Sequence, residues 1–146
     1  MKLVAAALNV ALQVLKSLGA EMGLIIRLLV GLAGLLALVL ALGFWINPDM
    51  LAAQFGIAPQ GPLGFSTLRA DFGALFAGTG MFAIAAAVRN NARLMTAPLL
   101  LIGIGFAGRL LTIALSGYDA SMLQPMVTEI VLIAIFAAGR KLLPVR

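Results

Sequence analysis

Four long apolar stretches constrain this chain more than any other feature of its sequence. They cover roughly residues 24–46, 65–88, 94–116 and 121–143. Each is close to the ~20 residues with which an α-helix crosses a hydrocarbon core about 30 Å thick. The apolar run 28–41 lacks the alternation of a barrel strand. With 63% hydrophobic and 10% charged residues, the sequence predicts an all-α fold, an integral membrane four-helix bundle.

The N-terminal segment carries a polar stripe. Residues 1–18 are mostly apolar, but the spacing of Lys2, Asn9, Gln13 and Lys16 places these four on one helical face. We interpret residues 1–22 as an extra amphipathic helix, interfacial or docked on a partner, and 23–146 as the membrane domain. A helix unbroken to Ile46 would be about 65 Å long, so we expect a break near residues 19–23. The alternative is an uncleaved signal-like start.

Basic residues lie on one side of the predicted bundle. The basic residues in the loops and helix ends of that side are Lys2, Lys16, Arg27, Arg89, Arg93, Arg140, Lys141 and Arg146. The loops of the other side contain no Lys or Arg, and their only charged residues are Asp49 and Asp119. This asymmetry predicts a multi-pass protein of the bacterial cytoplasmic (inner) membrane with both termini in the cytoplasm. The basic residues are spread over three helix ends, so we expect the lipid bilayer, and no nucleic acid, as their partner.

Three connections have recognisable turn chemistry. Asn47, followed by Pro48, is typical of a helix N-cap and first helical position, and Gly56 of a stop. This pattern predicts a short extramembrane helix between spans 1 and 2, with 59–62 leading into span 2. Tight turns are expected at 89–92 and 117–119, which would make the last three spans antiparallel neighbours.

Four ionisable residues fall inside the predicted spans. Counted from the outer turns, Arg69, Asp71, Arg109 and Glu129 all lie about 10–14 Å below the outer face. A charge at this depth is costly unless it is paired or hydrated, so we expect mutual pairing, with Arg109 and Glu129 as the best pair. Arg69 and Asp71 point about 200° apart on one helix and would face different neighbours.

Polar side chains at similar depths could satisfy the remaining donors and acceptors of this charged layer. They are Thr67, Thr112, Gln124 and Thr128. Two interpretations of the layer stay open. It could fix which helix lies beside which, or it could form a ligand site or proton relay entered from the periplasmic side.

No catalytic or metal site is predicted. The chain has no Cys and no His, which removes thiolate and imidazole chemistry and most transition-metal sites. Residues 103–108 spell a dinucleotide-binding pattern, but that chemistry needs a strand and an aqueous helix N-terminus. We interpret the glycines and alanines at 73, 77, 78, 80, 103, 107 and 108 as helix-packing positions. No cofactor is predicted, although the surface would accept a bound lipid.

The order of the distinctive residues resembles a known family. Arg69-Ala70-Asp71 opens the second span, Gly108-Arg109 lies late in the third and Glu129 in the fourth, after an Asn47-Pro48 exit. Over residues 23–143 this pattern resembles the bacterial membrane proteins catalogued as domain of unknown function 4345. The resemblance implies a four-helix topology and no particular activity. The overall shape is also similar, without a diagnostic motif, to the DoxX-like four-helix proteins.

Two functions agree with these observations. The first is an accessory or structural subunit of a larger membrane complex, in contact with other membrane protein subunits. The alternative is a small-molecule binding or transport-like protein that uses Arg69, Asp71, Arg109 and Glu129. An enzyme ranks last, because two carboxylates with two arginines resemble an ion-pair network more than an acid/base dyad.

Overall fold

The computed structural model describes the backbone of residues 2–145, and the side chains of 2–12, 14–18 and 20 lie outside this description. The described chain is helical and contains no strand. Its elements are α1 Lys2–Ile46, α2 Pro48–Gln54, α3 Gly61–Thr67, the π-helical η1 Leu68–Phe72, α4 Gly73–Arg89, the 3-10 turn η2 Ala92–Met95, α5 Thr96–Ser116, the 3-10 turn η3 Ala120–Met122 and α6 Leu123–Leu142. The predicted fold class is confirmed.

Four segments are long and apolar enough to cross a membrane. They are Glu21–Ile46, Gly61–Arg89, Ala92–Ser116 and Ala120–Leu142, close to the four predicted spans. The second starts four residues before the predicted 65, because Pro62 occupies the first turn of α3 instead of preceding the helix. The chain is therefore a membrane protein with four apolar helices.

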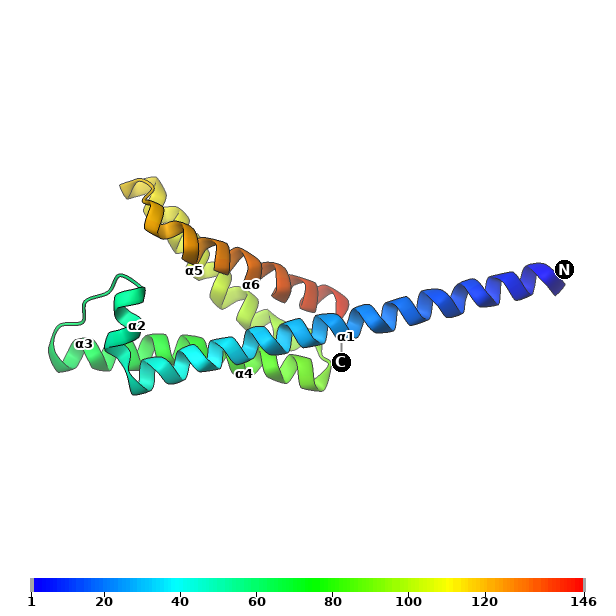
Figure 1. Cartoon of the computed structure of the whole chain (residues 1–146), viewed down its shortest axis with the longest axis horizontal. Coiled ribbons are helices and arrows are strands. Elements are labelled where there is room, and N and C mark those ends of the chain that lie inside the picture. Colours follow the sequence, from blue (N-terminus) through cyan, green and yellow to red (C-terminus); the bar gives the residue numbers. More distant parts are fainter. Residues whose placement is uncertain (1, 146) are drawn as a thin grey trace.

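The first helix is continuous, so the predicted break near residues 19–23 was wrong. Helix α1 runs from Lys2 to Ile46 without interruption, although Gly19 and Gly23 lie inside it. Each interior glycine costs only ~1 kcal/mol relative to alanine, and no proline is present there. The 19 residues before Glu21 add about 28 Å of helix, which extends past the other helices (Figure 1). The predicted polar stripe, apart from the exposed Gln13, lies outside the described side chains.

Helices α1 and α4 pack most closely. They are antiparallel and lie side by side over most of the length of α4 (Figure 1). A Cβ atom at Gly80 would lie 2.7 Å from the Gly34 carbonyl oxygen and 2.7 Å from Leu38 Cγ, and one at Gly73 would collide with the Trp45 indole. The predicted packing role of Gly73 and Gly80 is confirmed, because small residues let the backbones approach.

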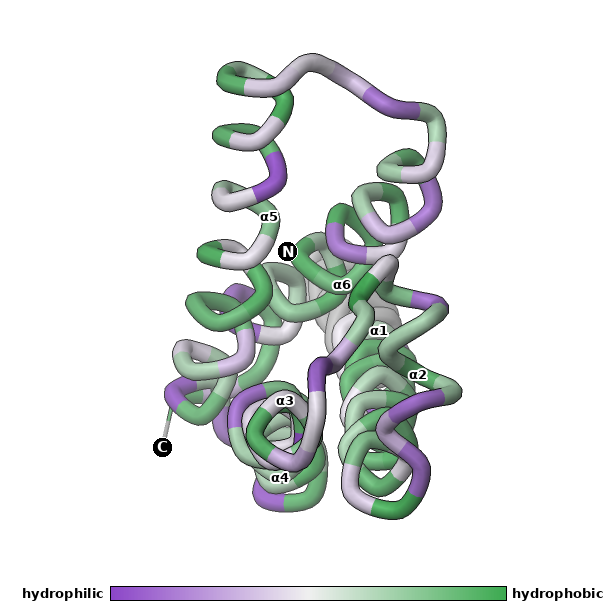
Figure 2. The backbone as a smooth tube through the Cα atoms, turned by 90° about the vertical axis from the view of Figure 1, so that its left-hand side faces the viewer, coloured by the Kyte–Doolittle hydropathy of each residue, from purple (hydrophilic) through white to green (hydrophobic). Residues whose placement is uncertain are grey.

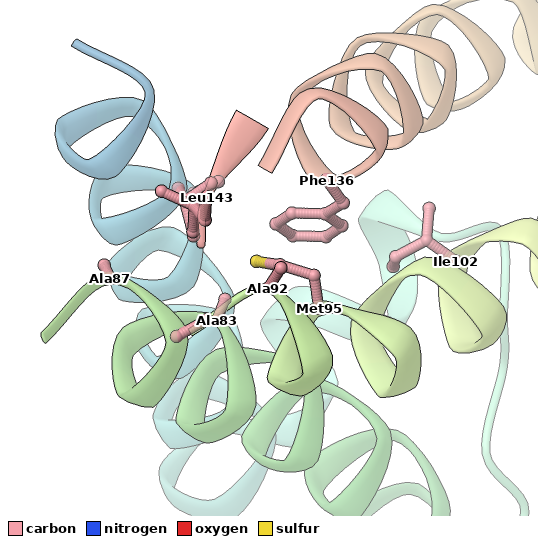
Figure 3. Packing of buried hydrophobic residues seen from close by; sticks show 10 residues of the cluster. Ala83, Ala87, Ala92, Met95, Ile102, Phe136 and Leu143 are labelled. Carbon is pink, nitrogen blue, oxygen red and sulfur yellow. The ribbon is translucent and has the colours of Figure 1, made fainter. Parts of the chain in front are cut away.

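All four spans meet at one end of the bundle, which we call the junction end. Here the buried core includes Val30 of α1, Ala83 of α4, Met95 of η2 and Phe136 of α6. The Met95 sulfur points toward the Phe136 ring (Figure 3), a favourable contact for a polarizable thioether. Two hydrogen bonds close this end, from Arg27 Nε to the Ala87 carbonyl (2.9 Å) and from the Ala92 N–H to the Pro144 carbonyl (2.9 Å).

The opposite end, which holds residues 47–60 and 117–120, is called the open end. Toward it α5 and α6 diverge as a pair from α1 and α4 (Figures 1 and 2). A second core there belongs to the α1–α4 side alone and contains Phe44, Leu51, Ala52 and Leu68. The Phe44 ring stacks on Phe76, with centroids 5.8 Å apart. At the open end, the α5–α6 hairpin therefore lacks the core contacts that α1 and α4 make with each other.

The predicted turns are confirmed by their caps. Asn47 Oδ1 accepts from the Met50 N–H (3.4 Å) at the start of α2, and Gly56 follows that helix with φ +69°. Asn90 adopts the left-handed conformation (φ 49°) between α4 and η2. Asp119 caps η3, where the hydroxyl and the backbone N–H of Ser121 hold the pKa of its carboxyl below the ordinary value.

The close approach of α1 and α4 gives a first test. Gly80→Ala places a methyl group against Gly34 and Leu38 and should lower the free energy of unfolding by about 1–3 kcal/mol, the usual cost of overpacking. Gly78→Ala is the matched control, because a Cβ there meets nothing within 4 Å, and it should not destabilise the protein. Thermal unfolding followed by circular dichroism in detergent measures both. Equal behaviour of the two variants would contradict this packing.

Candidate functional site

The strongest polar contact lies between α5 and α6. Arg109 Nε donates to Glu129 Oε1 over 2.8 Å, as predicted for the best pair. The two side chains are 31% and 17% exposed, so the pair is neither fully enclosed nor free on the surface. It is the one salt bridge among the described residues. The pair joins adjacent antiparallel helices and fixes their register.

One side of this pair is uncovered. Gly105, Gly108 and Thr112 recur with Arg109 at helical spacing along α5, and all three are exposed. A Cβ at Gly108 would meet nothing within 4 Å, and one at Gly105 only Glu129 Oε1 at 3.9 Å. We call Gly105, Gly108 and Thr112 the open strip. It is narrow and smooth because two of its three members lack a side chain.

Glu129 has an unsatisfied oxygen. Its Oε2 atom is buried and has no hydrogen-bond partner among the described residues, while Oε1 accepts from Arg109. A buried carboxylate oxygen without a donor is destabilising, and more so in hydrocarbon than near water. The contact with Arg109 therefore satisfies only half of this carboxylate.

Arg69 bonds to Trp45 of α1 and not to a described charged residue. Its Nε donates to the backbone carbonyl of Trp45 (3.1 Å), and Trp45 Nε1 donates to the backbone carbonyl of Arg69 (3.0 Å). The Trp45 carbonyl belongs to the last turn of α1, where carbonyls lack intrahelical partners and carry partial negative charge. These reciprocal bonds fasten the end of α1 to η1. Trp45 was not among the predicted site residues, although a lone tryptophan at the end of a span is typical of such an anchor.

The predicted mutual pairing of four charges was therefore wrong for two of them. Arg69 uses a backbone carbonyl, and Asp71, on the same π-helical turn, is exposed and forms no salt bridge with a described residue. The physical reason is the splay of the bundle, because Arg109 and Glu129 belong to α5 and α6, and these helices diverge from α1 and α4 toward the open end (Figure 2). The equal depth of the four residues stays a prediction.

The neighbouring hydroxyl groups do not serve the charges. Thr67, Thr112 and Thr128 each donate to the carbonyl four residues earlier in their own helix, all at 3.0 Å, and all three are exposed. Such back-bonding satisfies a hydroxyl without tertiary partners. Gln124 is exposed and forms no side-chain hydrogen bond with a described residue through its amide. The expectation that these groups complete the charged layer was wrong for the three threonines.

The predicted packing role of small residues in α5 was also wrong within this chain. A Cβ at Gly103 or at Gly108 would meet nothing within 4 Å, and Ala107 is exposed. No described helix occupies these positions, because α5 touches its neighbours mainly at the junction end through residues such as Pro98 and Ile102. The small face of α5 is open.

Comparison with known proteins identifies the family. The family model described as Domain of unknown function (DUF4345) matches residues 25–139. The chain belongs to the DUF4345 family. The match spans all four apolar helices and includes both members of the Arg109–Glu129 pair, whereas residues 1–24 precede it. No curated protein and no solved structure matches the chain, and the DoxX-like resemblance stays a prediction.

The main polar contact in this DUF4345 domain is an ion pair. Among the described residues, no three His, Cys, Asp or Glu side chains come together as metal ligands would. The Arg109–Glu129 pair has a donor and an acceptor in contact, and both side chains are partly exposed. A polar group from outside the chain can reach the exposed atoms of this pair, whereas the second carboxylate oxygen of Glu129 is enclosed. The absence of enzymatic activity stays a prediction.

A double-mutant cycle tests the pair. Arg109→Met and Glu129→Gln each leave one partner without its counter-charge and should each lower the free energy of unfolding by about 2 kcal/mol, less than for a fully enclosed pair. The double variant removes both charges and should be no less stable than either single variant. Thermal unfolding in detergent measures the cycle.

Thr112→Val is the control for this cycle. Its hydroxyl bonds only to its own helix, so its loss should change the free energy of unfolding by less than about 0.5 kcal/mol. Additive losses in the double variant, or a Thr112→Val loss as large as that of Glu129→Gln, would contradict the assignment of the pair.

Proposed function

We propose that this protein is an accessory subunit of a larger complex in the bacterial inner membrane, and that its open strip packs against a transmembrane helix of a different protein. Both termini then lie in the cytoplasm, in agreement with the basic residues at the junction end and the acidic loops at the open end. The observation that carries the proposal is the partly exposed Arg109–Glu129 pair beside the open strip.

Lipid is a poor neighbour for this pair. Acyl chains offer no hydrogen-bond donor to Glu129 Oε2 and no counter-charge to the exposed part of Arg109. Ionisable residues within membrane spans normally face a protein interior or a water-filled cavity. A partner helix with a Ser, Thr, Asn or Gln side chain at this level would bond to the exposed part of Arg109 or to Glu129 Oε1, the carboxylate oxygen nearest Gly105 of the open strip.

The shape of the α5–α6 hairpin supports the same proposal. In the most apolar part of each span, only 6% of the residues are buried within the chain for the span that contains α5 and 11% for the span that contains α6. The corresponding share for the second span is 39%. The open strip offers two glycines to an approaching backbone, the feature that lets membrane helices pack closely. The hairpin therefore has both a surface for close packing and a polar group to orient the packing.

Helix α1 offers a second contact outside the membrane. If Glu21 lies near the cytoplasmic face, the preceding residues project about 28 Å from it (Figure 1). This extension precedes the range matched by the family model. It would reach a cytoplasmic part of the partner complex.

The alternative, one ligand or transport site built from Arg69, Asp71, Arg109 and Glu129, has less support. The Nε of Arg69 is committed to the Trp45 carbonyl and that of Arg109 to Glu129. The two arginines thus serve different helix pairs, and no described contact joins them.

Native mass spectrometry of the protein gently solubilised from its own membranes tests the proposal. We expect a stoichiometric complex with a different membrane protein. Gly108→Leu should abolish this complex, because it fills the open strip, while leaving the chain folded, since a Cβ there meets nothing within 4 Å. Gly78→Leu is the matched control, because Gly78 is equally free of neighbours but lies on α4.

Three outcomes would contradict the proposal. The wild-type chain could be recovered alone and monodisperse, it could be recovered only as a homo-oligomer, or Gly108→Leu could retain the partner as well as Gly78→Leu does. Circular dichroism of each variant establishes that the helices are intact before the complexes are compared.

A further inference from the structure

An open groove of about 550 Å³ lies at the open end, on the α1–α4 side. Its walls come from the end of α1, the start of α2 and the α3–η1 segment, and they include Ile46, Asp49, Pro62, Phe65 and Arg69. The groove lies where the first apolar span ends, at Ile46, and the second begins, at Gly61. The indole of Trp45, one residue before the end of α1, is a group that favours a membrane–water boundary.

Two opposite charges line this groove without contact. Asp49 and Arg69 are both exposed, and the one salt bridge of the described chain is elsewhere, between Arg109 and Glu129. The Nε of Arg69 is held by the Trp45 carbonyl, while its two Nη groups form no hydrogen bond with a described residue. The bond from Nε anchors the guanidinium and leaves its outer donors available, the arrangement that suits a phosphate.

Most of the remaining lining of the groove is apolar, apart from Asn47. Ile46, Pro62 and Phe65 stand beside the charged residues, and Ile46 is 78% exposed. A ligand that satisfies all of these groups carries a negative charge for Arg69, a positive charge for Asp49 and an apolar portion that continues along the spans. A purely anionic ligand would leave Asp49 facing a like charge.

We propose that this groove binds the head group of a zwitterionic aminophospholipid in the outer leaflet. The lipid phosphate lies against Arg69, the primary ammonium donates to the Asp49 carboxylate, and the acyl chains continue along α1 and α4. A trimethylated head group cannot donate to Asp49, so the groove discriminates phosphatidylethanolamine from phosphatidylcholine. The groove is on the α1–α4 side, so this lipid site is independent of the proposed subunit interface.

Lipid retention in native mass spectrometry tests this site. The full chain is purified into micelles that contain equal amounts of phosphatidylethanolamine, phosphatidylcholine and phosphatidylglycerol with the same acyl chains. The wild type should retain phosphatidylethanolamine over phosphatidylcholine by about tenfold, the value of one charge-assisted hydrogen bond. Equal retention of these two lipids would overturn the proposal.

Asp49→Asn separates a binding role from a structural one. It should abolish the preference for phosphatidylethanolamine and raise the retention of the anionic phosphatidylglycerol, because it removes the negative charge from the groove. Asp119→Asn is the matched control. It removes an exposed aspartate from the other loop of the open end, keeps a capping residue there, and should leave the lipid ratios unchanged. An unchanged ratio in Asp49→Asn would overturn the proposal.

Three further measurements make the test specific. Arg69→Gln should lower retention of all three phospholipids in this groove. The emission of the only tryptophan, Trp45, which is hydrogen-bonded to Arg69, shows whether the groove is intact in each variant. Soluble phosphoethanolamine should not displace the lipid. If it displaces the lipid at the concentration at which it binds the empty groove, the ligand is a free zwitterion and the assignment to a lipid is wrong.

Discussion

The ion pair between α5 and α6 is the one salt bridge of the described residues, and the α5–α6 hairpin depends on it. Arg109 and Glu129 compensate each other across the two helices at 2.8 Å, which sets the helix register where few apolar side chains are buried. The compensation is incomplete, because one carboxylate oxygen is buried without a donor. The same contact thus stabilises the hairpin and makes its exposed side a suitable surface for a polar group from another molecule.

The two halves of the bundle are stabilised by different means. Helices α1 and α4 approach closely at Gly34 and Gly80 and share an aromatic core at the open end. Among the described residues, helices α5 and α6 join them mainly in the core around Met95, Phe136 and Gly139 at the junction end. The closely packed α1–α4 pair and the laterally exposed α5–α6 hairpin suit the proposed role, in which a neighbouring subunit packs on the hairpin.

Much of the fold was predictable, because hydrophobic length, caps and depth are local properties of the sequence. The spans, the Asn47 cap and the Arg109–Glu129 pair follow from counting residues along helices. The partner of Arg69 did not follow, because it is a backbone carbonyl, and every residue has one. The continuity of α1 was missed because two glycines weaken a helix without ending it. The open face of α5 was misjudged because glycine spacing indicates close packing without indicating which molecule provides the packing.

The most direct test of the proposed interface determines whether Thr112, beside the Arg109–Glu129 pair, contacts lipid or another protein in the native membrane. The chain has no cysteine, so a single nitroxide label can be placed at Thr112→Cys and, as a lipid-facing reference, at Leu32→Cys, where the native side chain is 63% exposed. Collision rates with oxygen, measured by electron paramagnetic resonance, are high in lipid and low in a protein interface. If a partner helix packs on the open strip, oxygen accessibility at Thr112 is low in native membranes and rises when the chain is purified alone. Oxygen accessibility at Leu32 is high in both samples. Equally high accessibility at both positions in native membranes would contradict it.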